Sequence, residues 1–225
     1  MTTTTSIHHL TANGVSLVVD TSSGAPIVVH WGRGLGDSDL THITDITTRA
    51  TPHGLLDATP GRGVKRDASQ GFLGRPSLQG HRDGLDWSTQ RTIQTVSHNG
   101  NELTVVSADE AAGIRVTTRF HLTDQGVLTV DKKLTNTGST PYYLHELGYW
   151  LPLPDRAVES MDFAGRWLKE RQPQRRPIGH GQWVREGREG RPGHDHTIVQ
   201  LSMTDGADFG HGEVWSMGLQ WSGNP

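Results

Sequence analysis

Apolar and polar residues alternate along much of the chain, and no stretch of a dozen residues shows the apolar spacing of a helix. In one segment Ile114, Val116 and Phe120 share one side, while Arg115 and Arg119 lie on the other. This period of two is typical of antiparallel strands with one solvated face. The strands that it predicts are Val15–Asp20, Ala25–Trp31, Arg91–His98, Glu102–Ser107, Gly113–Leu122 and Val127–Leu134.

The breaks between these strands have turn chemistry. Asn13 and Gly14, and the run from Asn99 to Asn101, supply residues that tolerate positive φ in tight hairpins. Asp124 to Gly126 suits a three-residue loop. Parallel strands need crossover helices, for which the chain has no pattern, so an all-β antiparallel sandwich is the predicted fold class.

Two segments interrupt the strand rhythm. Residues 52–89 are dense in Gly, Arg and Asp and are too long for a plain connector, which indicates a functional or flexible loop. Residues 165–193 contain eight basic residues with glutamates interleaved among them. This mixture favours a solvated or inter-subunit network of ion pairs over a nucleic-acid groove.

Composition limits the classes of function. The 225 residues include 21 Lys+Arg and 24 Asp+Glu, for a net charge of −3, so we expect no nucleic-acid partner and no anionic membrane partner. No apolar run approaches the roughly 20 residues of a spanning helix. Cysteine is absent, which excludes a disulfide framework and a cysteine nucleophile and favours a reducing compartment, so we predict a cytoplasmic protein.

Local motifs add little chemistry. His194 and His196 flank Asp195, but a third ligand at a fixed spacing is missing, so we predict no metal site. Signatures of a nucleophile elbow, a nucleotide loop and a calcium loop are also missing from the sequence. Several of the seven tryptophans stand beside polar or cationic residues, as on surfaces that stack against sugars.

Three stretches carry a resemblance to a known family. They read GFLGRPSLQGHRDGLDWS at residues 71–88, FAGRWLKERQPQRRPIGHGQWVREGREGRPGHDHTIVQL at 163–201, and GEVWSMGLQWSGN at 212–224. Their most specific features are GRW..ER followed by RE.R.GR.GHD, and then the pair GEVW and WSGN. In this order they resemble the N-terminal part of an α-galactosidase of the actinobacterial type, from family 36 of the glycoside hydrolases.

The resemblance implies an antiparallel β-supersandwich, galactose-mutarotase-like, that occupies residues 1–225 and is truncated before the catalytic (β/α)8 barrel of this family. The two catalytic aspartates of the family lie on that barrel. We therefore expect no catalytic residue, metal or cofactor in this chain, and no turnover by the chain alone. In the complete enzyme the resemblance implies retaining hydrolysis of terminal α-linked galactose by two carboxylates about 5 to 5.5 Å apart.

In the tetramers of this family, a loop of one sandwich reaches the active-site pocket of a neighbouring subunit. The resemblance therefore implies a homotetramer in which residues 61–87 form part of a neighbour's pocket rim. Arginine and aspartate would hold sugar hydroxyls there, and tryptophan would stack on the ring. The substrate-binding residues expected on this basis are Arg75, His81, Arg82, Asp86 and Trp87.

Two other readings stay open at this point. The tryptophans among polar residues also suit a free-standing carbohydrate-binding β-sandwich module. A mutarotase-like epimerase would use a histidine and a glutamate, for which His145 and Glu146 are candidates. The resemblance along the chain does not support the epimerase, and fold-level analogy alone is a poor guide to activity.

Overall fold

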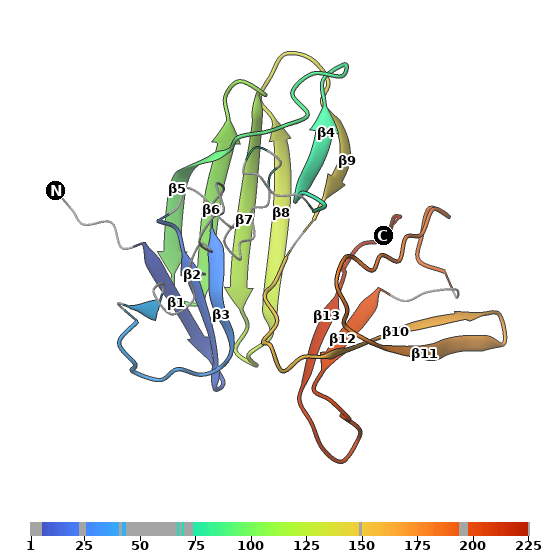
Figure 1. Cartoon of the computed structure of the whole chain (residues 1–225). Helices are drawn as coiled ribbons and strands as arrows, with labels where there is room; N and C mark the ends of the chain where they lie inside the picture. The colour runs from blue at the N-terminus through green and yellow to red at the C-terminus, as the bar shows by residue number, and fades with distance from the viewer. Residues whose placement is uncertain are drawn as a thin grey trace, which may run out of the picture. The chain divides into compact units, whose positions relative to one another are not determined.

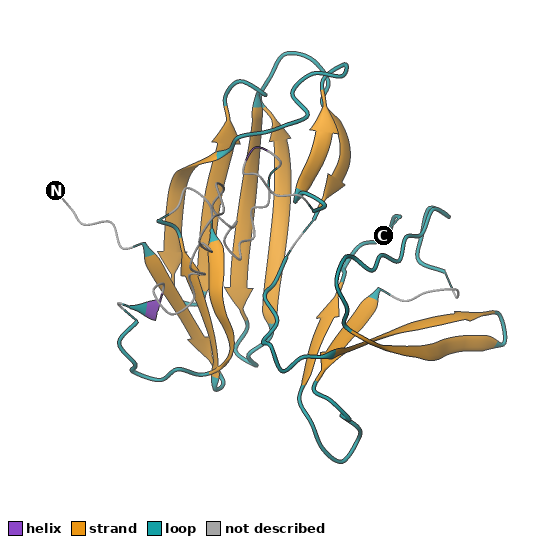
Figure 2. Ribbon diagram, viewed as in Figure 1, coloured by secondary structure: helices purple, strands orange, loops and turns teal. Residues whose placement is uncertain are grey.

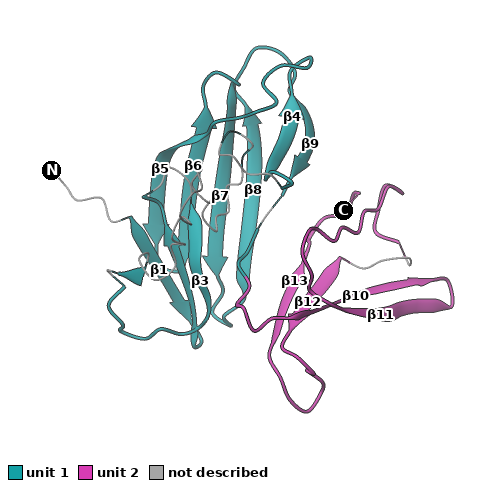
Figure 3. Ribbon diagram, in the orientation of Figure 1, with its two compact units in different colours: residues 1–152 teal, residues 153–225 magenta. Residues whose placement is uncertain are grey.

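A computed structural model describes residues 6–22, 26–40, 42–43, 67, 69, 74–148, 150–193 and 198–224. The elements of these residues are thirteen β-strands, paired antiparallel throughout, which confirms the all-β prediction. The chain divides into two compact units, Met1–Pro152 and Leu153–Pro225 (Figure 3). No helix within the described residues is long and apolar enough to cross a membrane.

Unit 1 contains three sheets, in the orders β1-β2-β3, β5-β6-β7-β8 and β4-β9 (Figures 1 and 2). Its strands are β1 (Ile7–Ala12), β2 (Val15–Asp20), β3 (Ile27–Arg33), β4 (Leu78–His81), β5 (Thr92–Asn99), β6 (Glu102–Asp109), β7 (Ile114–Leu122), β8 (Leu128–Asn136) and β9 (Tyr143–Leu147).

The main core of unit 1 lies between its two larger sheets. Leu10, Leu17, Val19 and Val28 of the three-stranded sheet form one buried cluster with Leu103, Val105, Phe120 and Leu122 of the four-stranded sheet. Each fully buried side chain of this kind contributes roughly 1.5–3 kcal/mol of transfer free energy. The strict alternation of buried and less buried residues along β7 confirms the one-faced pattern read from the sequence.

Alternating residues and turn sequences predicted most of these strands. β2 has the predicted bounds, and β3 begins and ends two residues later than predicted. The Asn13–Gly14 turn adopts φ angles of 47° and 73°, as its sequence predicts for a two-residue hairpin. The strand β1 on the other side of this turn was not predicted, because His8 and His9 mask its alternation.

Unit 2 is built on one four-stranded sheet in the order β11-β10-β12-β13. Its strands are β10 (Glu159–Arg166), β11 (Lys169–Pro177), β12 (Val199–Met203) and β13 (Val214–Gly218). Arg176 and Arg185 bind the two carboxylate oxygens of buried Asp162 at 2.6 and 2.5 Å. These two arginines do form ion pairs, but with a buried aspartate of the same chain, whereas the predicted solvated type is represented by Arg188 and Glu186.

Candidate sugar-contacting loop

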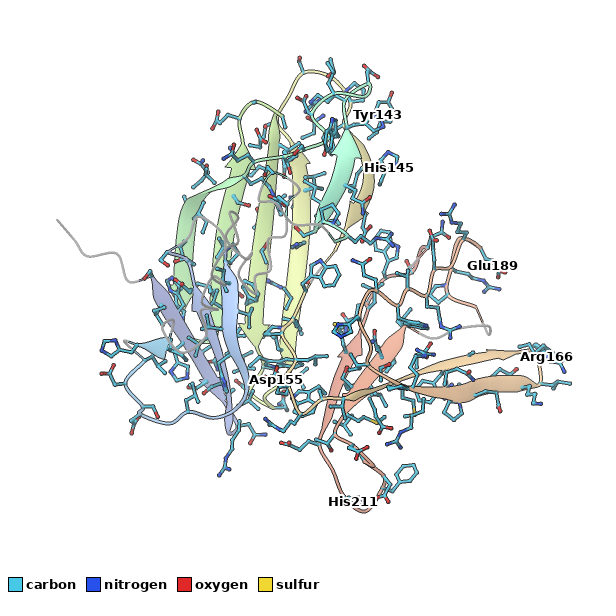
Figure 4. All side chains as sticks on the ribbon, viewed as in Figure 1. Tyr143, His145, Asp155, Arg166, Glu189 and His211 are labelled. Atoms are coloured by element: carbon cyan, nitrogen blue, oxygen red, sulfur yellow. The ribbon has the colours of Figure 1, made fainter. Side chains whose placement is uncertain are left out.

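The five predicted substrate-binding residues lie on or beside strand β4, which pairs with β9 in a two-stranded ribbon. Leu78 of β4 and Leu147 of β9 pack with Ile114 and Val116, so a second core cluster fixes the ribbon to the four-stranded sheet. Figure 4 labels Tyr143 and His145, whose side chains project from the β9 side of this ribbon. The ribbon thus holds the loop on a rigid support.

A tight turn follows β4. Arg82 and Leu85 exchange two backbone hydrogen bonds of 2.9 and 2.8 Å across Asp83 and Gly84. Both central residues have positive φ, 46° and 86°, which is the geometry of a type I′ hairpin turn and explains the Asp-Gly sequence. Leu85 is 70% exposed and Trp87, two residues later, 68% exposed. The turn therefore presents two apolar side chains to solvent.

Arg82 anchors this turn. Its Nε donates to the Ala112 carbonyl at 3.0 Å, and its Nη2 donates to the Gly113 carbonyl at 3.0 Å and to Asn136 Oδ1 at 2.5 Å. Its Nη1 donates to the carbonyl and the hydroxyl of Thr140. Because a guanidinium has only five N–H groups, each donor of Arg82 already has an acceptor in the chain. The geometry supports an anchoring role for Arg82 more than a sugar contact.

Arg75 keeps donors available for a ligand. Its Nε donates to Glu146 Oε2 at 2.5 Å, and Gln79 Nε2 donates to the same oxygen at 2.8 Å. The hydrogen bond to Glu146 uses only the Nε of this partly exposed guanidinium, and among the described residues no acceptor binds its two terminal nitrogens. Glu146 on β9 therefore orients Arg75, which the sequence predicts to bind substrate.

Imidazole and phenol rings gather beside the turn. The His81 ring stacks on the Tyr143 ring, with centroids 5.4 Å apart, and lies 5.2 Å from the His145 ring. The Gly84 amide donates to His81 Nδ1 at 3.1 Å, so the tautomer that fits carries its proton on Nε2. Rings of this kind offer flat faces for the C–H groups of a sugar.

The two ends of the loop are closed by a buried ion pair. Arg91 binds Asp67 through two bonds, Nη2 to Oδ1 at 2.5 Å and Nε to Oδ2 at 3.2 Å, and the side chains are 2% and 1% exposed. Nearby, the Lys132 amine donates to the Gly148 carbonyl at 2.6 Å. Burial, and then repulsion by Arg91, lower the pKa of Lys132 to about 7. The stem of the loop is thus a dry and charged environment.

The arrangement suits binding more than bond cleavage. The His145 ring lies beside the His81 ring, whereas Glu146 is held by Arg75 and Gln79. They do not form the histidine–glutamate pair that an epimerase needs. Among the described residues, no group of three His, Asp or Glu side chains could hold a metal ion. His194, Asp195 and His196, for which the sequence predicts no metal site, lie outside the described residues.

The sequence predicted the residues of the loop but not the residues that hold the loop in place. The structure brings His81 onto Tyr143 and Arg75 onto Glu146, whereas Asp86 and Trp87 lie beyond the turn. Tyr143, Asp67 and Arg91 were missed as parts of this site. Their partners are tens of residues away in the chain, so no local pattern marks them.

Comparison with known proteins agrees with this description. The profile of the Glycosyl hydrolase family 36 N-terminal domain matches residues 24–225. An alpha-galactosidase from Escherichia coli is 34% identical over 208 residues, which are 92% of this chain and 29% of that protein. Alpha-galactosidase AgaA from Geobacillus stearothermophilus is 27% identical over 155 residues, which are 68% of this chain and 20% of that protein.

Solved structures show the same fold. The GH36 alpha-galactosidase AgaA from G. stearothermophilus superposes with a TM-score of 0.80 and 22% identity, over 97% of this chain and 34% of its own. The alpha-galactosidase from Lactobacillus brevis gives a TM-score of 0.84 and 17% identity, over 97% and 33%. The predicted sandwich is confirmed, and the chain spans about a third or less of the length of these relatives.

Proposed function

The chain belongs to glycoside hydrolase family 36, in which it corresponds to the N-terminal domain, and from this premise we propose that it is the non-catalytic sandwich portion of an α-galactosidase. The observation that carries the proposal is the 34% identity to an alpha-galactosidase over 92% of the chain. The part of the relatives that this chain does not span is where we place the catalytic barrel and its two carboxylates. The domain prediction for residues 1–225 has the same basis.

For the complete enzyme we propose retaining hydrolysis of terminal α-linked galactose. AgaA variants have been solved in complex with stachyose and with raffinose, which indicates the class of oligosaccharide that such a protein binds. In this mechanism one carboxylate attacks the anomeric carbon while the other protonates the leaving oxygen and later activates water. None of these steps is assigned to a residue of this chain.

The role proposed for the chain itself is to complete the rim of a neighbouring subunit's pocket in a homotetramer. Arg75 supports this role, because Glu146 holds its Nε and leaves its outer nitrogens for sugar hydroxyls. The exposed Trp87 and the ring of His81 add faces for stacking. Asp86 remains a predicted hydroxyl acceptor, and Arg82 is proposed as the anchor of the turn. The cytoplasmic location remains a prediction, for which cell fractionation is the test.

Hydrolysis of an aryl α-galactoside tests the proposal. We expect no turnover by the 225-residue chain, and turnover once the chain is joined to the barrel of a related enzyme. In the joined enzyme, Trp87→Ala should raise KM by about 2- to 10-fold with little change in kcat, because one stacking contact is worth about 0.5–1.5 kcal/mol. Trp167→Ala removes a tryptophan of similar exposure outside the loop and is the matched control. Turnover by the isolated chain contradicts the proposal.

The exposed rings of the loop also favour a second candidate, a free-standing carbohydrate-binding module. Titration of the chain with galactose or raffinose, followed by tryptophan fluorescence, separates the two. Saturable binding in the millimolar range that Trp87→Ala abolishes favours the module. An unchanged spectrum favours the incomplete rim, which needs the neighbouring pocket to hold a sugar.

A further inference from the structure

Strand β1 carries a histidine on the side that faces the main core of unit 1. His8 and Leu10 are two residues apart on this strand and therefore point to the same face. Leu10 is fully buried in the core, and His8 is only 7% exposed. His8 is thus a titratable group at the border of an apolar core, where a neutral ring is tolerated and a charge is costly.

A second histidine faces His8 from the opposite sheet. The ring of His98, on β5, lies 5.5 Å from the His8 ring between centroids, with the two planes at 80°. Strand β1 belongs to the three-stranded sheet and β5 to the four-stranded sheet, so this contact joins the two larger sheets of unit 1 (Figure 1). An edge-to-face contact is favourable between neutral rings. Two imidazolium ions at this distance repel each other.

Hydrogen bonds fix where each ring carries its proton. Thr21 Oγ1 lies 3.2 Å from His8 Nε2, and Thr21 donates its own proton to the Ser6 carbonyl, so His8 Nε2 is the donor to Thr21. His98 Nε2 donates to the Gly100 carbonyl at 3.1 Å. A further proton can therefore add only at Nδ1 of either ring. Among the residues that the structure describes, His8 Nδ1 has no acceptor to bind that proton.

The nearest carboxylate does not compensate a charge on His8. Asp20 on β2 raises the pKa of His8, but its two oxygens already accept from the amide and the hydroxyl of Ser22 at 2.8 and 2.9 Å. Burial of the ring, and then the charge of His98, act in the opposite direction and leave the pKa of His8 below its ordinary value.

The other ionisable side chains of the strands that pack around β1 point elsewhere. They are His9 and His30 on the opposite face of the three-stranded sheet, Glu102, Arg115, Arg119 and His121 on the opposite face of the four-stranded sheet, and Arg33 and Asp109 at the far ends of β3 and β6. His98 is therefore the charge that His8 meets when the protein is acidified.

We propose that the contact between His8 and His98 is an acid-sensitive lock between the two larger sheets of unit 1. At neutral pH both rings are uncharged, and the ring contact and the bond to Thr21 hold β1 against the opposite sheet. On acidification the exposed His98 takes a proton first, because water solvates its charge. A proton on His8 then requires this ring to move into water, which separates β1 from the opposite sheet.

The direction of the effect follows from the burial of His8. In the open or unfolded chain the pKa of His8 is about 6.5, and in the closed sandwich it is lower. Between these two values the open chain binds more protons than the closed chain, so the closed form loses stability as the pH falls below about 6.5. One such group changes the equilibrium constant by at most about tenfold per pH unit.

Urea unfolding of the 225-residue chain at about pH 7.5 and about pH 5 tests the lock. His8→Gln keeps a donor for Thr21 but takes up no proton. On acidification the unfolding equilibrium constant of the parent should increase about three- to tenfold more than that of His8→Gln. His98→Gln still offers a donor to Gly100 and removes the opposing charge, so it should abolish part of this difference. His121→Gln removes a histidine from the solvated face of β7 and is the matched control, with the acid dependence of the parent.

Hydrogen exchange distinguishes local opening from general acid unfolding. Strand β1 is an outer strand of its sheet, so its amides lose protection once its packing on the opposite sheet is lost. In the parent at about pH 5, after correction for the intrinsic exchange rates, they should lose about tenfold more protection than the amides of the central strand β6. In His8→Gln the two strands should change alike.

Three results overturn the proposal: an equal acid dependence of the parent and His8→Gln, an acid dependence of His98→Gln equal to that of the parent, or a parent in which β1 keeps its protection relative to β6 at low pH. Circular dichroism at neutral pH confirms that each variant is folded before it is compared. The lock needs no galactoside chemistry. Any of these three results therefore contradicts this inference alone, whereas turnover by the isolated chain contradicts the proposed function alone.

Discussion

Replacement of Asp67 by asparagine removes the negative partner of Arg91 while it conserves the size of the side chain. Arg91 binds both oxygens of the carboxylate, and the two side chains are almost fully buried. The variant therefore leaves a charged guanidinium in a site from which water is excluded. The Lys132 amine is close enough for Arg91 to lower its pKa, so the site already contains a second cationic group.

The size of the effect follows from this burial. Removal of one partner of a buried ion pair costs about 3–5 kcal/mol, because the remaining charge is uncompensated. The whole free energy of unfolding of a domain is about 5–15 kcal/mol, so the variant should lose a large part of it. Asp67 also raises the pKa of Lys132, and its loss should move that pKa further below 7.

Urea unfolding followed by far-UV circular dichroism measures this loss. With a slope of about 1–3 kcal/mol per M, a change of 3 kcal/mol lowers the midpoint by at least about 1 M. Glu186→Gln breaks an exposed pair, in which Arg188 and Glu186 are 79% and 48% exposed, and should cost less than about 1 kcal/mol. The double variant Asp67→Leu with Arg91→Met removes both charges and should recover part of the stability.

Two results would refute this reasoning. One is an Asp67→Asn midpoint equal to that of Glu186→Gln, which would mean that water or another group already compensates Arg91. The other is a double variant no more stable than Asp67→Asn, which would show that volume and not charge controls this site.

Three other outcomes follow from single residues. Burial, and then Arg91, lower the pKa of Lys132 to about 7, so the unfolded chain binds more protons than the folded chain from about pH 7 to 10. The free energy of unfolding should therefore rise with pH across that window, by at most about 1.4 kcal/mol per pH unit. In urea unfolding at several pH values, Lys132→Met should flatten this rise. Among the described residues, the buried Tyr142 hydroxyl has no hydrogen-bond partner. Tyr142→Phe should therefore be as stable as the parent in urea unfolding, or more stable by up to about 1 kcal/mol, and a clear loss of stability would reveal a partner. A Cβ at Gly138 would lie 2.5 Å from Arg82 Nη2, so Gly138→Ala should displace the guanidinium and lower the free energy of unfolding by about 1–3 kcal/mol. An unchanged melting temperature would contradict the anchoring role of Arg82.

Strands with a clear alternation were predictable, and strands without one were not. Along β7 the apolar residues recur at every second position, so the strand and its buried face both follow from the sequence. Two histidines break this pattern in β1, although the predicted Asn13–Gly14 turn already requires a strand before it. In unit 2, charged and proline residues fill β11, which hides the hairpin that β10 and β11 form.

The candidate loop divides in the same way. Its location and its tryptophan among polar residues are local properties that the sequence indicates. The Asp83–Gly84 turn was not predicted, although its Asp-Gly sequence is a local signal too. The direction of each arginine is not local. Both arginines stand in the same Gly- and Asp-rich stretch of the sequence. In the structure, five acceptor atoms of other segments bind Arg82, whereas Arg75 contacts Glu146 through one nitrogen.

The sequence by itself determined the all-β class, the tight turns and the family resemblance, because side-chain period, positive-φ residues and ordered motifs are written along the chain. The tertiary structure alone decided which charged groups are buried together and which segments support the loop. Those properties depend on contacts between distant parts of the chain: Asp67 pairs with Arg91, and strand β4 pairs with β9.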